Sequence, residues 1–439
     1  MSQISFKLNL DKIKVLLKHL NNPHHRLSAI HISGTNGKGS TSAYIDSILL
    51  KTNFKTGRLN TPHLLEPRDS IKINDESITR EDYRRTYNFI STINSNNNIN
   101  ASLYEKLVAT AYWWFDAQNV DVSIVEVGIG GRLDATNVFE KPLISVITSI
   151  GMDHETFLGN SIEAISKEKA GIIKSGCKVV IAPQIEEASL NTLKTCIKEV
   201  GCSHSIFVTP AKWNPQKKGL ASLKLLDGTL IEFYIPLGGD YQLDNATTAI
   251  TVIDLLRKTE TKFSNITNEN IKDGIASTSW PGRLQFVNVS SILNRPVTNV
   301  TKQLLVDGAH NPQGAKSLRE FVDKLLQDKE FAKVPKVHWI YAASKEKNVL
   351  KCLDALVKDG DTLIAVEFSK VEDMPWVNCC KKEEIVLLVK KLNRKSDINI
   401  AENLVEAIKQ AYDKSEKEDG MIVLCGSLYL IADLFRLLV

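Results

Sequence analysis

A glycine-rich segment, Ser33-Gly34-Thr35-Asn36-Gly37-Lys38-Gly39-Ser40, carries the residue types needed to bind the phosphates of a nucleotide. It follows residues 29–32, whose apolar and β-branched character predicts a strand, and it precedes a stretch that can form a helix. Glycines let backbone N–H groups turn toward an anion, the helix start adds partial positive charge, and Lys38 adds a full charge. The strict pattern G-x-x-x-x-G-K-[ST] is not met, because Ile32 occupies its first glycine position and Gly39 follows the lysine. A simple turn between a strand and a helix is therefore the alternative.

Glu126 is a second candidate for chemistry, because it stands at the end of an apolar segment and before a glycine-rich loop. Residues 122–127 predict a buried strand, and open α/β sheets bind their ligands at the carboxyl ends of such strands. A carboxylate there would supply a hard oxygen ligand for a cation such as Mg²⁺. Taken alone, a glutamate at a strand end is more often a salt-bridge partner or a cap.

Short apolar segments recur along the chain and predict two parallel sheets whose faces are covered by helices, since the segments are apolar throughout rather than alternating. The first set of strands is expected at 29–33, 122–127, 144–149 and 178–182. The second set is expected at 303–307, 337–343, 362–368 and 421–425. Residues 204–240 are less regular and indicate a small antiparallel addition. The predicted fold class is therefore α/β.

The chain of 439 residues is long for one hydrophobic core, so about two or three domains are expected, with two as the simplest number. Residues 288–301 have no helical period and contain Pro296 with several Ser, Asn and Thr residues. We place the domain boundary there, which gives domains at 1–290 and 297–439.

Composition limits the function classes. The net charge of +4 is mild and the basic residues are spread along the chain, so nucleic acid is not supported as a partner. No apolar run reaches the length of about 18 residues that spans a bilayer, so a membrane protein is not expected. Seven cysteines without C-x-x-C spacing disfavour structural zinc and a disulfide framework. Residues 1–20 lack the features of a secretory signal, which makes the cytoplasm the default location and leaves mitochondrial association open. We expect a monomer.

The loop variant G-T-N-G-K-G-S resembles that of the Mur ligase superfamily, most closely its folate branch, the dihydrofolate and folylpolyglutamate synthases. Further blocks resemble signatures of that branch: Asn60-Thr61-Pro62-His63-Leu64, 126–137, Asp153-His154, 167–173, 241–246, 280–284, 307–312 and 426–429. They follow the family order over nearly the whole chain. The resemblance implies a P-loop ATPase domain with a parallel sheet flanked by helices, plus a smaller C-terminal Rossmann-like α/β domain.

The resemblance implies carboxylate activation, in which ATP phosphorylates a substrate carboxylate and the amine of an amino acid then displaces phosphate. ATP is then a co-substrate, held by Gly34, Thr35, Asn36, Gly37, Lys38, Gly39 and Ser40. Lys38 would contact the β- and γ-phosphates. The implied contacts to adenine, phosphate and ribose are Asn245, Arg283 and Asp307, respectively.

The resemblance also implies two Mg²⁺ sites. Thr61, Glu126 and His154 match the family's metal ligands. Lys169 matches a position that is carbamylated in related enzymes, where the modified lysine becomes an anion able to bind a second Mg²⁺. Viewed alone, Lys167-Glu168-Lys169 would be an exposed helix face. Dependence on a monovalent cation is left open.

The implied small-molecule substrates are dihydropteroate, L-glutamate and ATP. The resemblance gives His310 and Ser427 roles near glutamate and the acyl phosphate, with His310 in the catalytic set, so the two domains would meet around the reacting groups. Tyr104, Asp134 and Ala135 match positions that hold dihydropteroate in related bifunctional enzymes. Tyr104 could equally be a residue of a helix core.

Within the folate branch, two activities share one scaffold: addition of the first glutamate to dihydropteroate, and extension of the glutamate tail of folate. Arg68-Asp69-Ser70-Ile71 replaces the E-R-I pattern usual in folylpolyglutamate synthases. Asn36 and residues 372–377 resemble fungal dihydrofolate synthases more closely. We therefore expect dihydrofolate synthesis, with a polyglutamylating or bifunctional enzyme as the alternative. A nucleotide-binding module without catalysis is a third hypothesis.

Overall fold

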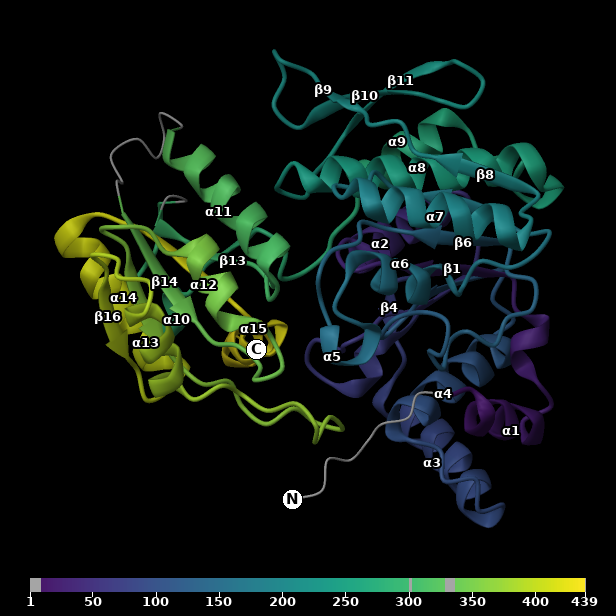
Figure 1. Ribbon diagram of the computed structural model, residues 1–439, viewed down its shortest axis with the longest axis horizontal. Coiled ribbons are helices and arrows are strands. Elements are labelled where there is room, and N and C mark those ends of the chain that lie inside the picture. The colour runs from purple at the N-terminus through teal and green to yellow at the C-terminus, as the bar shows by residue number, and fades with distance from the viewer. Residues whose placement is uncertain (1–8, 300–301, 328–335, 439) are drawn as a thin grey trace. The chain divides into compact units, whose positions relative to one another are not determined.

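The computed structural model describes residues 9–299, 302–327 and 336–438, and the chain divides into two compact units. The first unit comprises Met1–His63, Arg68–Pro236 and Tyr241–Ser279, and the second comprises Leu64–Pro67, Leu237–Asp240 and Trp280–Val439. In Figure 1 the first unit runs mainly from purple to teal and the second from green to yellow. Each unit is a sheet with helices packed against it, which confirms the predicted α/β class.

The first unit is built on an eight-stranded sheet with the order β4-β3-β2-β5-β1-β6-β7-β8. The strands are β1 (Ala29–Ser33), β2 (Thr56–Leu59), β3 (Ile71–Ile73), β4 (Glu76–Ser77), β5 (Val122–Glu126), β6 (Ile144–Ile147), β7 (Lys178–Ile181) and β8 (His204–Phe207). The pairs from β2 to β8 are parallel, whereas β3 and β4 form an antiparallel edge. The four strands predicted for this sheet are present as β1, β5, β6 and β7.

The antiparallel addition predicted over 204–240 is correct only in part. β9 (Lys212–Trp213), β10 (Leu220–Lys224) and β11 (Leu230–Tyr234) form a three-stranded antiparallel sheet, drawn beside α9 in Figure 1. Residues 204–207 belong instead to the main sheet, where β8 pairs parallel with β7. The side chains of β8 are mostly exposed, so this edge strand lacks the apolar character from which the other parallel strands were predicted.

Helices cover both faces of the main sheet. They are α1 (Asp11–His19), α2 (Lys38–Leu50), α3 (Arg80–Asn96), α4 (Leu103–Ala117), α5 (Glu155–Leu158), α6 (Ile162–Ala170), α7 (Glu187–Val200), α8 (Tyr241–Thr259) and α9 (Asn268–Ala276), with 3₁₀ turns at Pro23–Arg26, Pro67–Ser70 and Thr261–Phe263. α2 packs on α8, α9 and the strands β2 and β5. The opposite face meets two apolar cores, one with α1 and α4 and the other with α6 and α7.

The second unit contains a six-stranded sheet with the order β12-β13-β17-β14-β15-β16. Its strands are β12 (Gln285–Val287), β13 (Leu304–Val306), β14 (Val337–Tyr341), β15 (Thr362–Ala365), β16 (Asp397–Ile400) and β17 (Met421–Cys425). Its helices are α10 (Ser290–Leu293), α11 (Pro312–Gln327), α12 (Val349–Leu356), α13 (Lys382–Lys390), α14 (Leu404–Glu418) and α15 (Leu428–Leu438). All pairs but β12–β13 are parallel. The four predicted strands are present as β13, β14, β15 and β17.

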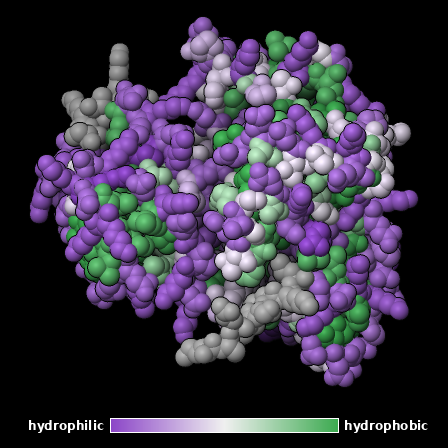
Figure 2. Space-filling model, in the orientation of Figure 1, coloured by the Kyte–Doolittle hydropathy of each residue, from purple (hydrophilic) through white to green (hydrophobic). Residues whose placement is uncertain are grey.

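On the face of the second unit that Figure 2 shows, hydrophobic side chains gather over α13 within a largely polar surface. Leu387 of this helix is 60% exposed. Within the described ranges, no helix is long and apolar enough to cross a membrane.

The boundary between the two units lies earlier than the boundary expected over 288–301. The first unit ends at Ser279, and β12 already pairs antiparallel with β13 of the second unit. Because β12 is short and only one of its side chains is buried, its sequence gives no strong strand signal. Residues 300 and 301 of the predicted linker lie outside the described residues.

Candidate functional site

The glycine-rich segment connects β1 to α2, as predicted, and the segment after β6 holds it in place. The backbone N–H groups of Thr35 and Asn36 donate to the carbonyl of Ser149 at 2.9 and 3.1 Å. Gly34 lies so close to Thr148 that a Cβ atom would come within 1.9 Å of its hydroxyl oxygen. Only glycine fits this approach, and the two hydrogen bonds to Ser149 hold the start of the loop against the segment after β6.

The first turn of α2 is left open by the protein's own side chains. Gly37 precedes the helix with φ +87°, and no side chain of the described residues caps this end. Several other helices of the same unit start at a capping Thr or Ser: Thr79 at α3, Ser102 at α4, Ser161 at α6 and Thr267 at α9. The first N–H groups of a helix lack intrahelical partners and attract anions. The first N–H groups of α2 are therefore available to a phosphate, whereas in those other helices a side chain of the protein accepts a hydrogen bond from the first turn.

Lys38 brings its charge to this open end. Its ammonium donates to the carbonyl of Thr35 at 3.2 Å and lies 3.8 Å from Oε1 of Glu126, so it belongs to both the loop and the end of β5. Glu126 is only 5% exposed, and it accepts a hydrogen bond from Asn60 at 2.8 Å. The structure thus places the predicted phosphate lysine and the predicted metal carboxylate side by side.

The residues present fit a magnesium ion, which takes oxygen ligands and keeps several waters. Asn60 and Thr61 follow β2, which pairs parallel with β5, so they emerge at the same sheet edge as Glu126. The Thr61 hydroxyl is buried and has no hydrogen-bond partner among the described residues. A buried hydroxyl of this kind is costly unless a ligand satisfies it.

His154, the third predicted metal ligand, lies in the loop between β6 and α5. Its backbone has φ +53°, its N–H donates to Oδ1 of Asp153 at 2.9 Å, and its Nε2 lies 3.8 Å from the other oxygen of Asp153. The carboxylate of Asp153 therefore helps to set the orientation of the imidazole. That His154 shares one ligand set with Thr61 and Glu126 stays a prediction.

Lys169 lies beneath the phosphate loop rather than on an exposed helix face. It is 4% exposed, and its ammonium donates to the carbonyl of Gly34 at 2.7 Å. The alternative of a solvated helix face is therefore wrong for this residue. In the unmodified form, Lys169 supports the start of the phosphate loop.

The predicted adenine residue, Asn245, is also brought to the loop. Its Nδ2 donates to Oε1 of Gln242 at 3.0 Å, and Nε2 of Gln242 donates to the hydroxyl of Ser40 at 3.2 Å. A Cβ atom on Gly37 would lie 2.2 Å from Oδ1 of Asn245. α8 therefore contacts the loop through two amides, of which the sequence analysis assigned only one.

Tyr104, Asp134 and Ala135, predicted to contact a pterin, lie together near the loop after β5. The Tyr104 hydroxyl donates to Oδ1 of Asp134 at 3.1 Å and accepts from the N–H of Gly128 at 3.0 Å. Asp134 also accepts from the N–H of Ile129 at 2.9 Å. Burial raises the pKa of Asp134 and holds the pKa of Tyr104 well above its usual range. These contacts hold the loop together, and contact of the three residues with substrate stays a prediction.

This network extends to a buried histidine on β1. Oγ1 of Thr136 donates to Oδ1 of Asp134 at 2.6 Å and lies 2.9 Å from Nε2 of His31. Since the hydroxyl hydrogen of Thr136 is directed to Asp134, Nε2 of His31 carries the hydrogen of the second bond. Burial lowers the pKa of His31 to about 3, so the ring is neutral at physiological pH.

In the second unit, Asp307 follows β13 and organises the turn into α11. Its carboxylate accepts the N–H groups of Ala309 at 2.8 Å and Leu284 at 3.0 Å, and it is 5% exposed. The Arg283 guanidinium lies against Gly308, where a Cβ atom would come within 2.3 Å of it. Arg283 and Asp307 thus lie in neighbouring segments of the second unit, and their predicted contacts to phosphate and ribose stay predictions.

His310 and Ser427 lie at the same edge of this second sheet. Nδ1 of His310 donates to the carbonyl of Gly308 at 2.7 Å, which fixes the orientation of the ring. Ser427 follows β17, the neighbour of β13, and its hydroxyl accepts the N–H of Tyr429 at 3.1 Å. Their predicted roles near glutamate and the acyl phosphate are untested.

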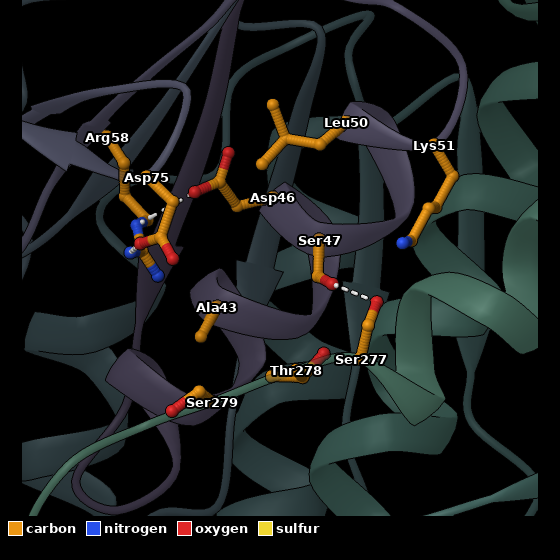
Figure 3. A pocket seen from close by; sticks show the side chains of 10 residues that line it. All are labelled: Ala43, Asp46, Ser47, Leu50, Lys51, Arg58, Asp75, Ser277, Thr278 and Ser279. Carbon is orange, nitrogen blue, oxygen red and sulfur yellow. Dashed lines mark hydrogen bonds and ion pairs between the residues drawn. The ribbon is translucent and has the colours of Figure 1, made fainter.

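A cavity of about 240 Å³ occurs elsewhere in the first unit, between α2, β2 and the residues after α9. Figure 3 shows its lining, which includes none of the predicted site residues: Ala43, Asp46, Ser47, Leu50, Lys51, Arg58, Asp75, Ser277, Thr278 and Ser279. Nε of Arg58 lies 3.1 Å from Oδ2 of Asp46, and the same guanidinium contacts Asp75. This buried ion pair joins α2 to β2.

The sequence analysis missed Asn60 and Gln242 as parts of the site. Asn60 belongs to a block that it quoted, and Gln242 stands three residues before Asn245 on one helix, which places both on one face. That spacing was an available signal for Gln242. Asn60 could have been found only if β2 had been recognised as a strand.

Comparison with known proteins identifies the family of this chain. The family model of the Mur ligase middle domain matches residues 32–253, and that of the C-terminal domain of dihydrofolate synthetase matches residues 288–437. A probable dihydrofolate synthetase of Schizosaccharomyces pombe is 37% identical over 434 residues, which cover 98% of each chain. The dihydrofolate synthetase of Saccharomyces cerevisiae is 34% identical over 99% of this chain and 98% of its own.

Among solved structures, folylpolyglutamate synthase of Mycobacterium tuberculosis complexed with ADP is similar, with a TM-score of 0.81 and 28% identity. The likeness covers 98% of this chain and 94% of that chain. Together with the two fungal relatives, these matches span both units. The chain belongs to the dihydrofolate synthetase family of Mur ligases.

Proposed function

We propose that this protein joins L-glutamate to 7,8-dihydropteroate, consuming ATP and releasing dihydrofolate, ADP and phosphate through an acyl phosphate. The observation that carries the proposal is the open first turn of α2, with Lys38 at 3.8 Å from the buried carboxylate of Glu126. Membership of the dihydrofolate synthetase family and the names of the two fungal relatives support the choice of substrate.

The phosphate loop would bind the triphosphate through the N–H groups that begin α2, while Lys38 would bind the oxygens of the β- and γ-phosphates. Transfer of the γ-phosphoryl group depends on positioning and on stabilising charge rather than on covalent help from the protein. Thr61, Glu126 and His154 would hold Mg²⁺, which neutralises charge on the phosphates when it is bound. Asn245 would hold the base against the loop.

Lys169 has two roles compatible with its position. We propose carbamylation as the functional form, because Lys169 is 4% exposed beneath the phosphate loop and matches the position that is carbamylated in related enzymes. The contact with the Gly34 carbonyl supports the competing role, an ammonium that props the loop. The intact mass in bicarbonate separates the two roles, and an unmodified lysine in a fully active enzyme would contradict carbamylation.

In the second unit, we propose that Arg283 contacts phosphate, that Asp307 contacts the ribose, and that His310 and Ser427 serve glutamate and the acyl phosphate. The shared edge of β13 and β17 supports a common function for these residues. We further propose that Tyr104, Asp134 and Ala135 contact the pterin, and that the protein works as a cytoplasmic monomer.

The test is incubation with ATP, Mg²⁺ and glutamate together with either dihydropteroate or tetrahydrofolate, read by release of ADP and by the mass of the product. We expect ADP release in the incubation with dihydropteroate and none in the incubation with tetrahydrofolate. Product from tetrahydrofolate alone would instead identify a folylpolyglutamate synthase, which the likeness to the Mycobacterium tuberculosis enzyme keeps as the second candidate. Product from both acceptors would identify a bifunctional enzyme, and no ADP with either would favour a binding module.

A further inference from the structure

Asn60 is a buried amide at the point where β2 ends, beside the proposed metal carboxylate. Its side chain is 8% exposed, and its backbone N–H donates to the carbonyl of Ser70 at 3.0 Å, so its position is fixed. Nδ2 donates to Oε2 of Glu126 at 2.8 Å and to the hydroxyl of Ser42 at 2.7 Å. An amide nitrogen carries two hydrogens, and here both are used.

These contacts connect the phosphate loop with the end of β5. The Ser42 hydroxyl donates to the carbonyl of Gly39 at 2.7 Å and accepts from Asn60. Asn60 in turn holds one oxygen of Glu126, while the other oxygen is the one nearer to Lys38, at 3.8 Å. A glutamate side chain can otherwise rotate about its last bond, so the amide sets the direction of the carboxylate.

The docking of α2 on β2 does not depend on Asn60. Figure 3 shows an independent connection in which Asp46 of α2 meets Arg58 of β2, with 3.1 Å between Oδ2 and Nε. The hydroxyl of Thr56 donates to the other oxygen of Asp46 at 2.5 Å. Because this buried pair already joins the two elements, loss of the Asn60 amide should change the orientation of Glu126 more than the fold.

We propose that Asn60 is a positioning residue that orients Glu126 toward the divalent cation bound with the nucleotide and couples that carboxylate to the phosphate loop. The proposal rests on the magnesium and nucleotide parts of the proposed function. It needs no contact between Asn60 and either ligand. Hydrogen-bond partners of metal ligands usually contribute about 10- to 100-fold to metal affinity.

Calorimetric titration of the full chain with ADP, once in Mg²⁺ and once in EDTA, tests the proposal without relying on turnover. The ratio of the two affinities measures how much the cation strengthens nucleotide binding. Asn60→Leu keeps the side-chain size but removes the donor, and it should reduce this ratio by about tenfold. The affinity in EDTA should stay within about twofold of the wild type, because the phosphate donors of α2 are unchanged. Asn60→Ala provides a second variant if the leucine is poorly accommodated.

Glu126→Gln provides the matched background. In the Glu126→Gln background, Asn60→Leu should not lower the ratio of the two ADP affinities any further, because the carboxylate that Asn60 orients is already absent. Any loss of unfolding free energy that Asn60→Leu causes should still be seen in this background. An unchanged ratio in Asn60→Leu, or an equal loss of affinity in Mg²⁺ and EDTA, would overturn the positioning role and leave the proposed function intact. A wild-type chain whose ADP affinity is indifferent to Mg²⁺ would overturn both the positioning role and the magnesium part of the proposed function.

Discussion

Each unit carries a parallel strand into a long helix through a loop that contains predicted site residues, but the two loops treat the start of that helix in opposite ways. α2 follows Gly37, and no side chain of the described residues caps its first turn. α11 begins at Pro312, which has no N–H to satisfy, and Oδ1 of Asn311 accepts the N–H of Gly314 at 2.8 Å. The first helix leaves its donors open, whereas the second caps them with its own side chain.

The difference indicates where an anion can bind without displacing an internal contact. At α2, no side chain of the described residues accepts the first N–H groups, so these donors are available to an anion beside Lys38. At the α11 loop, the side chains of Asp307 and Asn311 accept backbone N–H groups, so fewer backbone donors remain there for an anion. The predictions below test this contrast.

The largest effect is expected from Lys38→Ala. Removal of the cation beside the phosphates should lower kcat by about 10²- to 10³-fold, because preorganised charge stabilises the transition state of phosphoryl transfer. The free energy of unfolding should fall by only about 1 kcal/mol, the net contribution of the hydrogen bond that Lys38 donates to the Thr35 carbonyl. Steady-state ADP release and urea denaturation measure the two quantities.

Lys51→Ala is the matched control, because Lys51 lies at the other end of the same helix. It should leave kcat within about twofold of the wild type, as surface substitutions usually do. If Lys38→Ala retained near-normal turnover, the open end of α2 would not be the phosphate site.

The sequence predicted most of the fold, because continuous apolar segments such as 122–126 signal a strand buried on both faces. β2 was missed because its sequence, Thr56-Gly57-Arg58-Leu59, holds a single aliphatic residue, and its burial depends on a pairing of Arg58 with Asp46 that only the fold creates. Asn60 was therefore not connected with Glu126. Lys38 and Glu126 were assigned separate roles from the sequence, and the structure brings them to 3.8 Å because each follows one of the two neighbouring parallel strands β1 and β5.

A second prediction concerns the free energy of unfolding at acid pH. It tests β1, the strand that leads into the phosphate loop. His31 on β1 has its pKa lowered to about 3 by burial, and its Nδ1 has no hydrogen-bond partner among the described residues. The unfolded chain takes up the proton first, so the stability that neutral His31 provides above pH 6.5 is lost progressively between pH 6.5 and about 3. From pH 7 to pH 5 the loss should be about 2 kcal/mol.

His31→Gln isolates this contribution, because glutamine can donate to Thr136 but does not titrate. Urea denaturation at pH 7 and pH 5 should show the wild type losing about 2 kcal/mol more than the variant. An equal loss in both proteins would show that His31 is protonated, or exposed, in the folded state.

Gly37→Ala tests the residue that precedes the open turn. With φ +87°, an L-residue costs about 1–2 kcal/mol of stability, and the added Cβ would lie 2.2 Å from Oδ1 of Asn245. Because that contact must move, ADP affinity in EDTA should fall by about tenfold, an effect of about 1.4 kcal/mol. Gly176→Ala is the control, since Gly176 has φ +70° and a Cβ atom added there would meet nothing within 4 Å. It should lower stability to a similar extent and leave ADP affinity unchanged.

The smallest effect is expected at α11, the helix whose first turn is capped. It tests whether the loops that precede α2 and α11 differ in anion binding. Asn311→Ala removes the side chain that accepts from Gly314, so unfolding of the second unit should become easier by about 1 kcal/mol. Asn311→Asp keeps an acceptor at the same place and should restore most of that stability. ADP affinity should be unchanged in both variants, because the donors that begin α2 are untouched. If Asn311→Ala weakened ADP binding as much as Gly37→Ala does, the capped turn of α11 would share the work of phosphate binding, and the contrast between the two loops would not hold.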